Sequence, residues 1–267
     1  MTLGKVMAAV FSAYIPTIIL VPAIFKLLKR GGAVVYNYRG RPVINAGGLG
    51  LLLGAIPSLF FLGVPPFFLT ALLGMALLGL LDDLLGSGEA RGMRGHFARL
   101  LRGELTTGAV KALGGGFLAL WLATRIKTSI AEILLAALCI ALMTNTLNLL
   151  DLRPGRALKF FWLGVCAFIW FHPGAALYLC PLAGASLAYL PYEMAEEGML
   201  GDTGANVLGL ALGAAAAWAL PAATQAALVA FLLLLHLYAE KYSLTRAIET
   251  RPWLAFFDRL GTGRQDN

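Results

Sequence analysis

Long apolar runs, separated by short polar or Pro- and Gly-containing segments, fill most of this chain. They cover about residues 3–28, 46–63, 66–85, 107–124, 129–150, 158–172, 174–192, 203–220 and 222–239. Apolar runs of about 20 residues predict helices that cross a bilayer, and these runs lack the apolar–polar alternation of membrane barrel strands. We therefore expect an all-α polytopic membrane protein with about nine transmembrane helices, forming a single membrane-embedded domain over residues 1–267.

The composition agrees with this class, because 59% of the residues are hydrophobic and only 13% are charged, against about 25% charged in soluble proteins. The first run is too long for the core of a signal peptide, and its basic cluster follows it, so we interpret it as a retained span. Cys139, Cys166 and Cys180 lie inside apolar runs without the spacing of a zinc or redox motif, which indicates buried apolar positions.

The distribution of Lys and Arg predicts the orientation in the membrane. If nine spans alternate, nearly all basic residues fall on one side, whereas Lys5, Arg125 and Lys127 fall on the other and Lys111 lies within the fourth run. The basic side should be cytoplasmic, which places the N-terminus outside and the tail, residues 240–267, in the cytoplasm of a plasma-membrane protein. The net charge of +7 thus indicates topology and attraction to anionic lipids, and we expect no nucleic-acid partner.

Two adjacent carboxylates, Asp82 and Asp83, end the third run, which starts near Pro65. A helix from there rises about 1.5 Å per residue, so the pair lies roughly 25 Å from its start, at the cytoplasmic interface. Adjacent helical side chains point about 100° apart. The two carboxylates should therefore have different roles.

A second polar group ends the fifth run, where Asn145, Asn148 and Asp151 recur at a spacing of three. This spacing places them on one helical face, where two amides and a carboxylate can hold a nucleotide or a hydrated cation. Arg153 and Arg156 follow in a basic turn that suits phosphate. The alternatives are a polar cap on a membrane helix and positive-inside anchoring.

Further candidates are Asp202, Lys111 and Asn45. Asp202 opens the eighth run, where it is either a site residue or only a helix N-cap. Lys111 either contacts a substrate phosphate or extends its side chain to the membrane interface. Asn45 precedes a glycine-rich helix start. The histidines lack metal-ligand spacing. Carboxylates from three cytoplasmic helix ends, surrounded by Arg and Lys, suit Mg²⁺ bound together with a phosphate.

Four motifs together resemble the polyprenyl-phosphate N-acetylhexosamine-1-phosphate transferase superfamily, glycosyltransferase family 4. They are Asn45–Gly50, which resembles a glycine pair opening the second helix; Gly79–Gly86, with the double Asp; Asn145–Asp151, an Asn-x-x-Asn-x-x-Asp pattern; and Met199–Gly209, which resembles Met-Gly-Asp-x-Gly-Ser. Lys111 stands where that family carries a lysine after the double Asp. The resemblance extends from about residue 40 to the end of the chain.

The resemblance implies an enzyme that transfers a sugar-1-phosphate from a UDP-sugar to a polyprenyl phosphate, releasing UMP, in cell-envelope glycan initiation. It implies Mg²⁺ as the cofactor, with Mn²⁺ as an alternative, a lipid phosphate and a nucleotide-sugar as substrates, and a homodimer as one oligomeric form. The implied catalytic residues are Asp82, Asp83, Asp202 and Lys111, the implied metal ligands are Asp202 and Asp151, and Asn148 and Asp151 are the implied substrate-binding residues. The residue pattern itself adds Asn45, Asn145, Arg153 and Arg156 as candidate substrate-binding residues.

Two departures from the family pattern keep alternatives open. After Asp151 the family continues Gly-x-Asp-Gly, whereas this chain continues Leu152-Arg153-Pro154-Gly155, and the His-rich cytoplasmic loop of the family is absent. A non-catalytic relative that binds lipid phosphate or partner proteins is therefore the first alternative. A cation or solute transporter is the second, although the run interiors offer few polar groups for a transport path.

Overall fold

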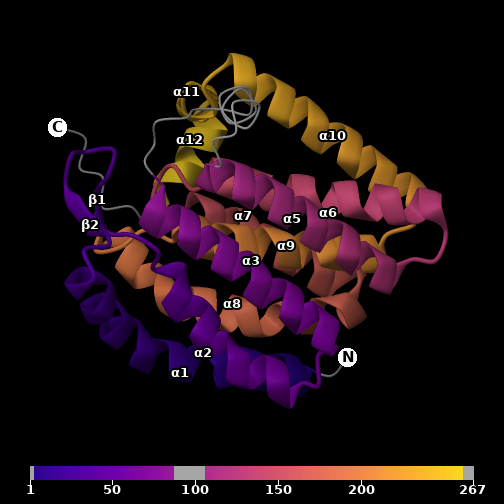
Figure 1. The fold of residues 1–267 in the computed structure, drawn as a ribbon, viewed down its shortest axis with the longest axis horizontal. Coiled ribbons are helices and arrows are strands. Elements are labelled where there is room, and N and C mark those ends of the chain that lie inside the picture. The colour runs from indigo at the N-terminus through magenta and orange to yellow at the C-terminus, as the bar shows by residue number, and fades with distance from the viewer. Residues whose placement is uncertain (1–2, 87–105, 261–267) are drawn as a thin grey trace.

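The computed structural model describes residues 3–86 and 106–260, and these residues form an almost entirely helical bundle (Figure 1). The main helices are α1 (Leu3–Arg30), α2 (Gly48–Phe61), α3 (Pro66–Leu85), α5 (Thr107–Ile126), α6 (Ile130–Leu150), α7 (Arg156–Phe171), α8 (Pro173–Met194), α9 (Gly201–Ala219) and α10 (Ala222–Lys241). Each of the nine predicted runs thus contains a helix whose ends lie within a few residues of the prediction. Proline at the first helical position begins α3 and α8, as its fixed φ favours.

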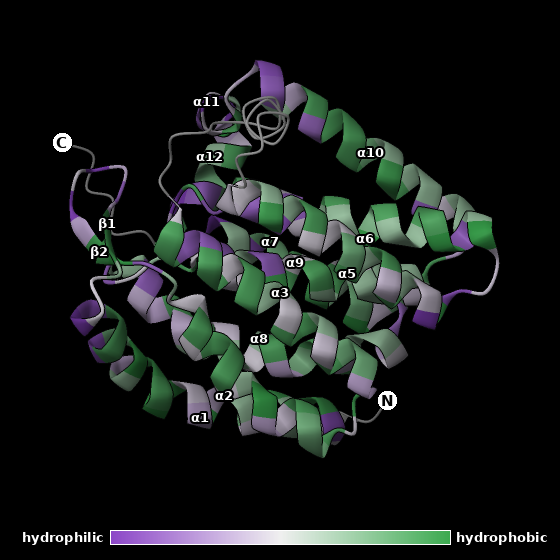
Figure 2. Ribbon diagram, viewed as in Figure 1, coloured by the Kyte–Doolittle hydropathy of each residue, from purple (hydrophilic) through white to green (hydrophobic). Residues whose placement is uncertain are grey.

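Six of these helices are long and apolar enough to cross a membrane, namely α1 from Gly4, α3, α5, α6, α8 and α10. Figure 2 shows hydrophobic residues along the helices and hydrophilic residues near their ends, above all around the hairpin and α11. The prediction of an all-α polytopic membrane protein is confirmed. The shorter helices α2 and α7 have 14 and 16 residues, and the crossing number of nine and the orientation stay predictions.

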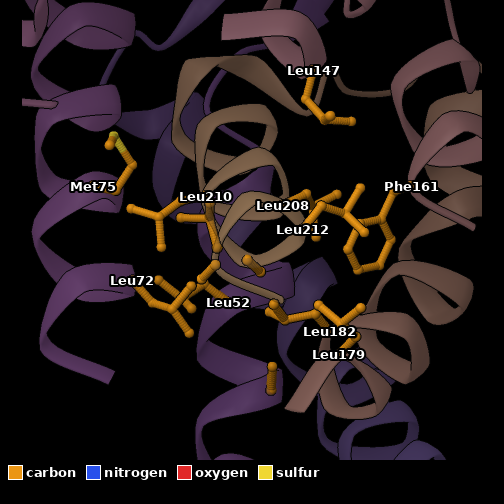
Figure 3. Close-up of a cluster of buried hydrophobic side chains, with 14 of the residues drawn as sticks. Leu52, Leu72, Met75, Leu147, Phe161, Leu179, Leu182, Leu208, Leu210 and Leu212 are labelled. Atoms are coloured by element: carbon orange, nitrogen blue, oxygen red, sulfur yellow. The ribbon is translucent and has the colours of Figure 1, made fainter. Parts of the chain in front are cut away.

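The centre of the bundle is α9, which contacts α2, α3, α5, α6, α7 and α8. Its residues from Thr203 to Ala217 are buried without exception, and Figure 3 shows leucines of α9 surrounded by apolar side chains of the neighbouring helices. The helix is rich in glycine and alanine, and small residues let membrane helices approach closely. This central position brings the polar N-terminus of α9 against the ends of several other helices.

A two-stranded antiparallel hairpin, β1 (Val34–Tyr36) and β2 (Pro42–Ile44), joins α1 to α2 and is an element that the sequence analysis did not predict. Ile44 also pairs with the segment before α9, since its N–H donates to the Glu197 carbonyl at 3.1 Å and its carbonyl accepts from Met199 at 2.8 Å. Gly48 then donates to the Leu200 carbonyl at 2.9 Å. These bonds hold the start of α2 beside the start of α9.

The tail after α10 forms two short helices, α11 (Leu244–Glu249) and α12 (Pro252–Arg259). They pack near the start of α7 (Figure 1), where Arg156 of α7 forms an ion pair with Asp258 of α12. The predicted tail, residues 240–267, is therefore a docked helical segment over its described part.

Candidate active site

Three helices bring Asp82, Lys111 and Asp202 into direct contact. The ammonium of Lys111, from α5, donates to Asp82 Oδ2 of α3 at 2.6 Å and also to Asp202 Oδ2 of α9. All three side chains are partly exposed, so a soluble ligand can reach them. The sequence analysis proposed all three, and the structure places two carboxylates on either side of one cation.

Two asparagines extend this cluster on the other side of Asp202. Asn148 Nδ2, from α6, donates to Asp202 Oδ1 at 2.5 Å and to Asn206 Oδ1 at 3.1 Å. Asn206 is buried, and its Nδ2 has no hydrogen-bond partner among the described residues. The sequence analysis missed Asn206, although its position four residues after Asp202 places both on one helical face.

Asp83 has a different role from its neighbour, as expected for adjacent helical positions. Its Oδ1 accepts from the Asp202 N–H at 3.0 Å, and its Oδ2 accepts from the N–H of Thr203 at 2.9 Å and from its hydroxyl at 2.6 Å. The first N–H groups of a helix lack partners within the helix. Asp83 of α3 therefore caps α9, while Asp202 faces Lys111, and the alternative that Asp202 is only an N-cap is wrong.

We expect Asp83→Ala to lower the free energy of unfolding by about 1–3 kcal/mol, because donors at the start of α9 lose their acceptor. Thermal unfolding in detergent measures the change. Thr203→Val is the matched control: it removes only the hydroxyl bond and should have a smaller effect. A variant with wild-type thermal stability and no activity would instead support the predicted catalytic role of Asp83.

Asn45 and Gly201 complete the packing around this cap. Asn45 Nδ2 donates to the backbone carbonyl of Asp83 at 3.1 Å, so its described contact is with the end of α3. Gly201 has φ +68°, and a Cβ there would lie 2.6 Å from Asp83 Oδ2. Only glycine fits this left-handed position without strain.

Asp151 ends α6 and connects the cluster to an adjoining pocket. It is half-buried and bonded to the backbone of Gly201. Loss of hydration, together with the nearby carboxylates of Glu193, Asp83 and Asp202, raises the pKa of Asp151 well above its usual value. A bound cation would favour its ionised form.

The adjoining pocket lies between the hairpin, the loop after α6 and the segment before α9, and its cavity volume is about 30 Å³. The residues that line it are Asn37, Tyr38, Val43, Asp151, Leu152, Arg153, Pro154, Glu193, Glu196, Gly198 and Met199. The Arg153 guanidinium lies 3.9 Å from the centre of the Tyr38 ring. Glu193, which sequence analysis did not select, is buried; its Oε1 accepts from Gly155 N at 2.8 Å, and its Oε2 has no partner among the described residues. The pocket therefore carries both an arginine and an unsatisfied carboxylate oxygen.

The other two predicted substrate-binding residues are placed differently. Asn145 is exposed one turn before Asn148, and no hydrogen bond of its side chain is recorded within the described ranges. Arg156 does not face the cluster: its Nε and Nη2 donate to the two oxygens of Asp258 at 2.8 and 3.0 Å, and its Nη1 donates to Thr245 at 3.2 Å. Because this buried ion pair occupies the guanidinium, the structure corrects the prediction that Arg156 binds substrate.

We expect Arg156→Ala to release the tail, because Asp258 would be left buried and unpaired, which typically destabilises by about 3–5 kcal/mol. Faster tryptic cleavage at Arg246 and Arg259, which are exposed and are not followed by proline, measures the release. The double variant Arg156→Ala/Asp258→Ala removes the unpaired charge and should lose less protection than the single variant. Unchanged protection of the tail in Arg156→Ala would contradict this role.

The residues of the cluster fit a metal ion only in part. Within the described residues, no group of three His, Cys, Asp or Glu side chains is arranged to hold one. Mg²⁺, however, commonly binds one or two protein carboxylates together with substrate phosphates and water. Asp82 and Asp202 already hold a cation, the Lys111 ammonium, between them. Asp202 also lies close enough to Asp151 to act on its charge, so Asp202 with Asp151 suits a metal bound along with a phosphate.

Comparisons with known proteins show the family of this chain. Residues 66–220, more than half of the chain, match the model of glycosyl transferase family 4. The phospho-N-acetylmuramoyl-pentapeptide-transferases of Clostridium perfringens strains SM101 and 13 are each 28% identical to this chain in alignments of 232 positions. The alignments cover 77% of this chain and 71% and 73% of the two relatives. The matched range contains Asp82, Lys111, Asn148 and Asp202, and it confirms the resemblance seen in the motifs. This multi-pass membrane protein belongs to glycosyl transferase family 4.

Proposed function

We propose that the protein is a Mg²⁺-dependent phosphoglycosyl transferase at the cytoplasmic face of the plasma membrane. It moves a sugar-1-phosphate from a UDP-sugar to a polyprenyl phosphate, forming polyprenyl-diphosphate-sugar and UMP. The observation that carries this proposal is the contact of Asp82, Lys111 and Asp202, from three helices, at one end of the bundle. The names of the relatives, transferases of a phosphorylated amino-sugar peptide, support the same reaction class.

In the proposed reaction, a phosphate oxygen of the lipid attacks the phosphorus that carries the sugar. A new P–O bond forms, the P–O bond of the donor anhydride breaks, and UMP leaves with the bridging oxygen. Asp82 orients the attacking lipid phosphate and takes its proton if it arrives protonated. Lys111 then supplies positive charge next to the phosphates, where negative charge develops in phosphoryl transfer.

Mg²⁺, or Mn²⁺ in its place, would be held by Asp202 with Asp151 nearby, and it would neutralise charge on the donor diphosphate. Asn148 fixes the orientation of Asp202 through its 2.5 Å hydrogen bond. Asn206 in turn accepts from Asn148. These two amides thus keep the carboxylate in one rotamer when a ligand displaces Lys111.

We place the nucleotide part of the donor at the adjoining pocket. Asp151 lines the pocket and is also close enough to Asp202 for their charges to interact. A donor could therefore extend from the pocket to Asp202. Arg153, stacked on Tyr38, offers a guanidinium to a phosphate. The cavity has room for about one or two water molecules, so a nucleotide would have to displace the Arg153 and Tyr38 side chains.

The test is a transfer assay on the purified protein in detergent, with undecaprenyl phosphate, Mg²⁺ and a panel of UDP-sugars that includes UDP-N-acetylglucosamine and UDP-N-acetylmuramoyl-pentapeptide. We expect UMP release with one donor, loss of release with EDTA, and recovery on adding Mg²⁺ or Mn²⁺. No release with any donor, despite binding of lipid phosphate, would favour the non-catalytic relative. Release that persists in EDTA would contradict the metal dependence alone.

A further inference from the structure

The short tail helix α12 has two unlike faces. Trp253, Phe256, Phe257 and Leu260 follow the i, i+3, i+4, i+7 spacing of one helical face, and they are 62%, 63%, 54% and 45% exposed. Ala255 and Asp258 lie on the opposite face and are 9% and 6% exposed. One face is therefore packed on the protein, and the other presents four large apolar side chains outward.

The rotation of α12 about its axis is set by polar contacts on the packed face. Asp258 forms the bidentate pair with Arg156. Lys159 donates to the carbonyls of Phe257 and Asp258 at 3.1 and 2.7 Å, at the last turn of α12, where a cation also complements the helix dipole. The apolar face cannot turn towards the bundle unless these contacts break.

The chain around α12 has the charge of a segment that meets anionic lipid. Lys241, Arg246, Arg251 and Arg259 are exposed, and Asp258 is neutralised by Arg156. The segment follows α10 directly, and α10 is a candidate membrane span that ends at Lys241. Since only ten residues separate Lys241 from Pro252, α12 stays close to the membrane surface at which α10 ends.

We propose that α12 lies in the headgroup region of the leaflet at which α10 ends, with its Trp253–Leu260 face inserted among the acyl chains. Amphipathic helices with aromatic residues on one side and basic residues near their ends bind such interfaces, and tryptophan is enriched at this depth. Exposed basic residues near the surface add attraction to anionic lipids.

Insertion of α12 into the membrane would also restrict the movement of the loop after α6. Asp258 of the tail holds Arg156, and Glu249 of α11 bonds to Arg153 at 3.3 Å. Arg153 belongs to the same short loop as Asp151, and Arg156 begins α7 directly after that loop. The proposed lipid contact of α12 would therefore bear on the loop that borders the pocket.

Site-directed spin labelling of the full chain in phosphatidylglycerol-containing liposomes tests the proposal. A nitroxide is placed at Phe256→Cys in a Cys166→Ala background. Cys166 is exposed, which corrects its predicted burial, whereas Cys139 and Cys180 are buried as predicted. The matched control is Tyr36→Cys on the hairpin, another exposed aromatic position (78% exposed). We expect the label at position 256 to collide several-fold more often with oxygen than with a water-soluble nickel chelate, and the label at position 36 to show the opposite preference.

Two results would overturn the proposal. Greater collision with the nickel chelate at position 256 would show that the face is in water, and exclusion of both reagents would show that a protein surface, such as a second copy, covers it. The unsubstituted protein provides an independent measurement by hydrogen–deuterium exchange in nanodiscs. Amides of residues 253–260 should exchange more slowly in anionic than in zwitterionic lipid, and equal exchange would also count against the proposal.

Discussion

Asp202→Asn should reduce the turnover number for UMP release by about 10³-fold, the size of effect seen when a preorganised charge partner of a transition state is removed. The substitution keeps the shape of the side chain and its hydrogen bond with Asn148, but it removes the negative charge that faces Lys111. The loss should appear in kcat as well as in kcat/KM, because the proposed metal at this position would act on charge that develops during transfer. Steady-state kinetics with the donor identified in the panel measures both constants.

Glu197→Gln is the matched control, since it also converts an acid to its amide on the same polar face, five residues earlier in the chain. Glu197 is exposed, and we expect near wild-type turnover from this variant. Asp202→Asn with turnover within a factor of ten of the wild type would remove Asp202 from the centre of the proposed mechanism. The unfolding temperatures of both variants show whether a loss of turnover comes from the chemistry or from a loss of folded protein.

Gly79→Ala should reduce turnover by about 10²-fold, although it removes no polar group. A Cβ at Gly79 would lie 2.5 Å from the carbonyl oxygen of Asp202 and 2.6 Å from the nitrogen of Thr203. The backbone of α9 must therefore shift away from α3, and a displacement of about 1 Å at a reacting group costs on the order of 10²-fold. Overpacking should also lower the free energy of unfolding by about 1–3 kcal/mol.

Gly116→Ala provides the matched control for this second prediction. It makes the same substitution within a helix of the bundle, α5, but a Cβ there would meet no atom within 4 Å. We expect turnover to be unchanged and stability to be unchanged or higher, because alanine favours the helix by about 1 kcal/mol over glycine. Equal turnover of the two variants would mean that the α3–α9 contact does not position Asp202.

The helical architecture could be predicted from sequence because it depends on local apolarity. Each predicted run contains a helix, and boundaries such as Pro66 and Pro173 follow from local backbone chemistry. The hairpin between α1 and α2 could not be predicted in the same way. Its strands have three residues each and are supported by pairing with the distant segment before α9, a contact that no local pattern reveals.

The candidate site, too, could be predicted only in part from local sequence patterns. Sequence patterns selected Asp82, Lys111, Asn148 and Asp202, and the structure brings them together across separations of 29 to 91 positions. The patterns did not reveal that Asp83 caps α9 or that Arg156 holds the tail, because both roles depend on partners more than 100 positions away. They also missed Glu193, whose significance comes from burial against the loop that contains Gly155.

The sequence by itself therefore determined the membrane class, the helical segments and the residue types available for phosphate and metal chemistry. Only the tertiary structure decided which of two adjacent carboxylates faces Lys111 and which arginines remain near the pocket. The physical reason is the range of the interactions. Helix formation and membrane insertion depend on neighbouring residues, whereas the partner of a polar side chain depends on how α3, α5, α6 and α9 pack against one another.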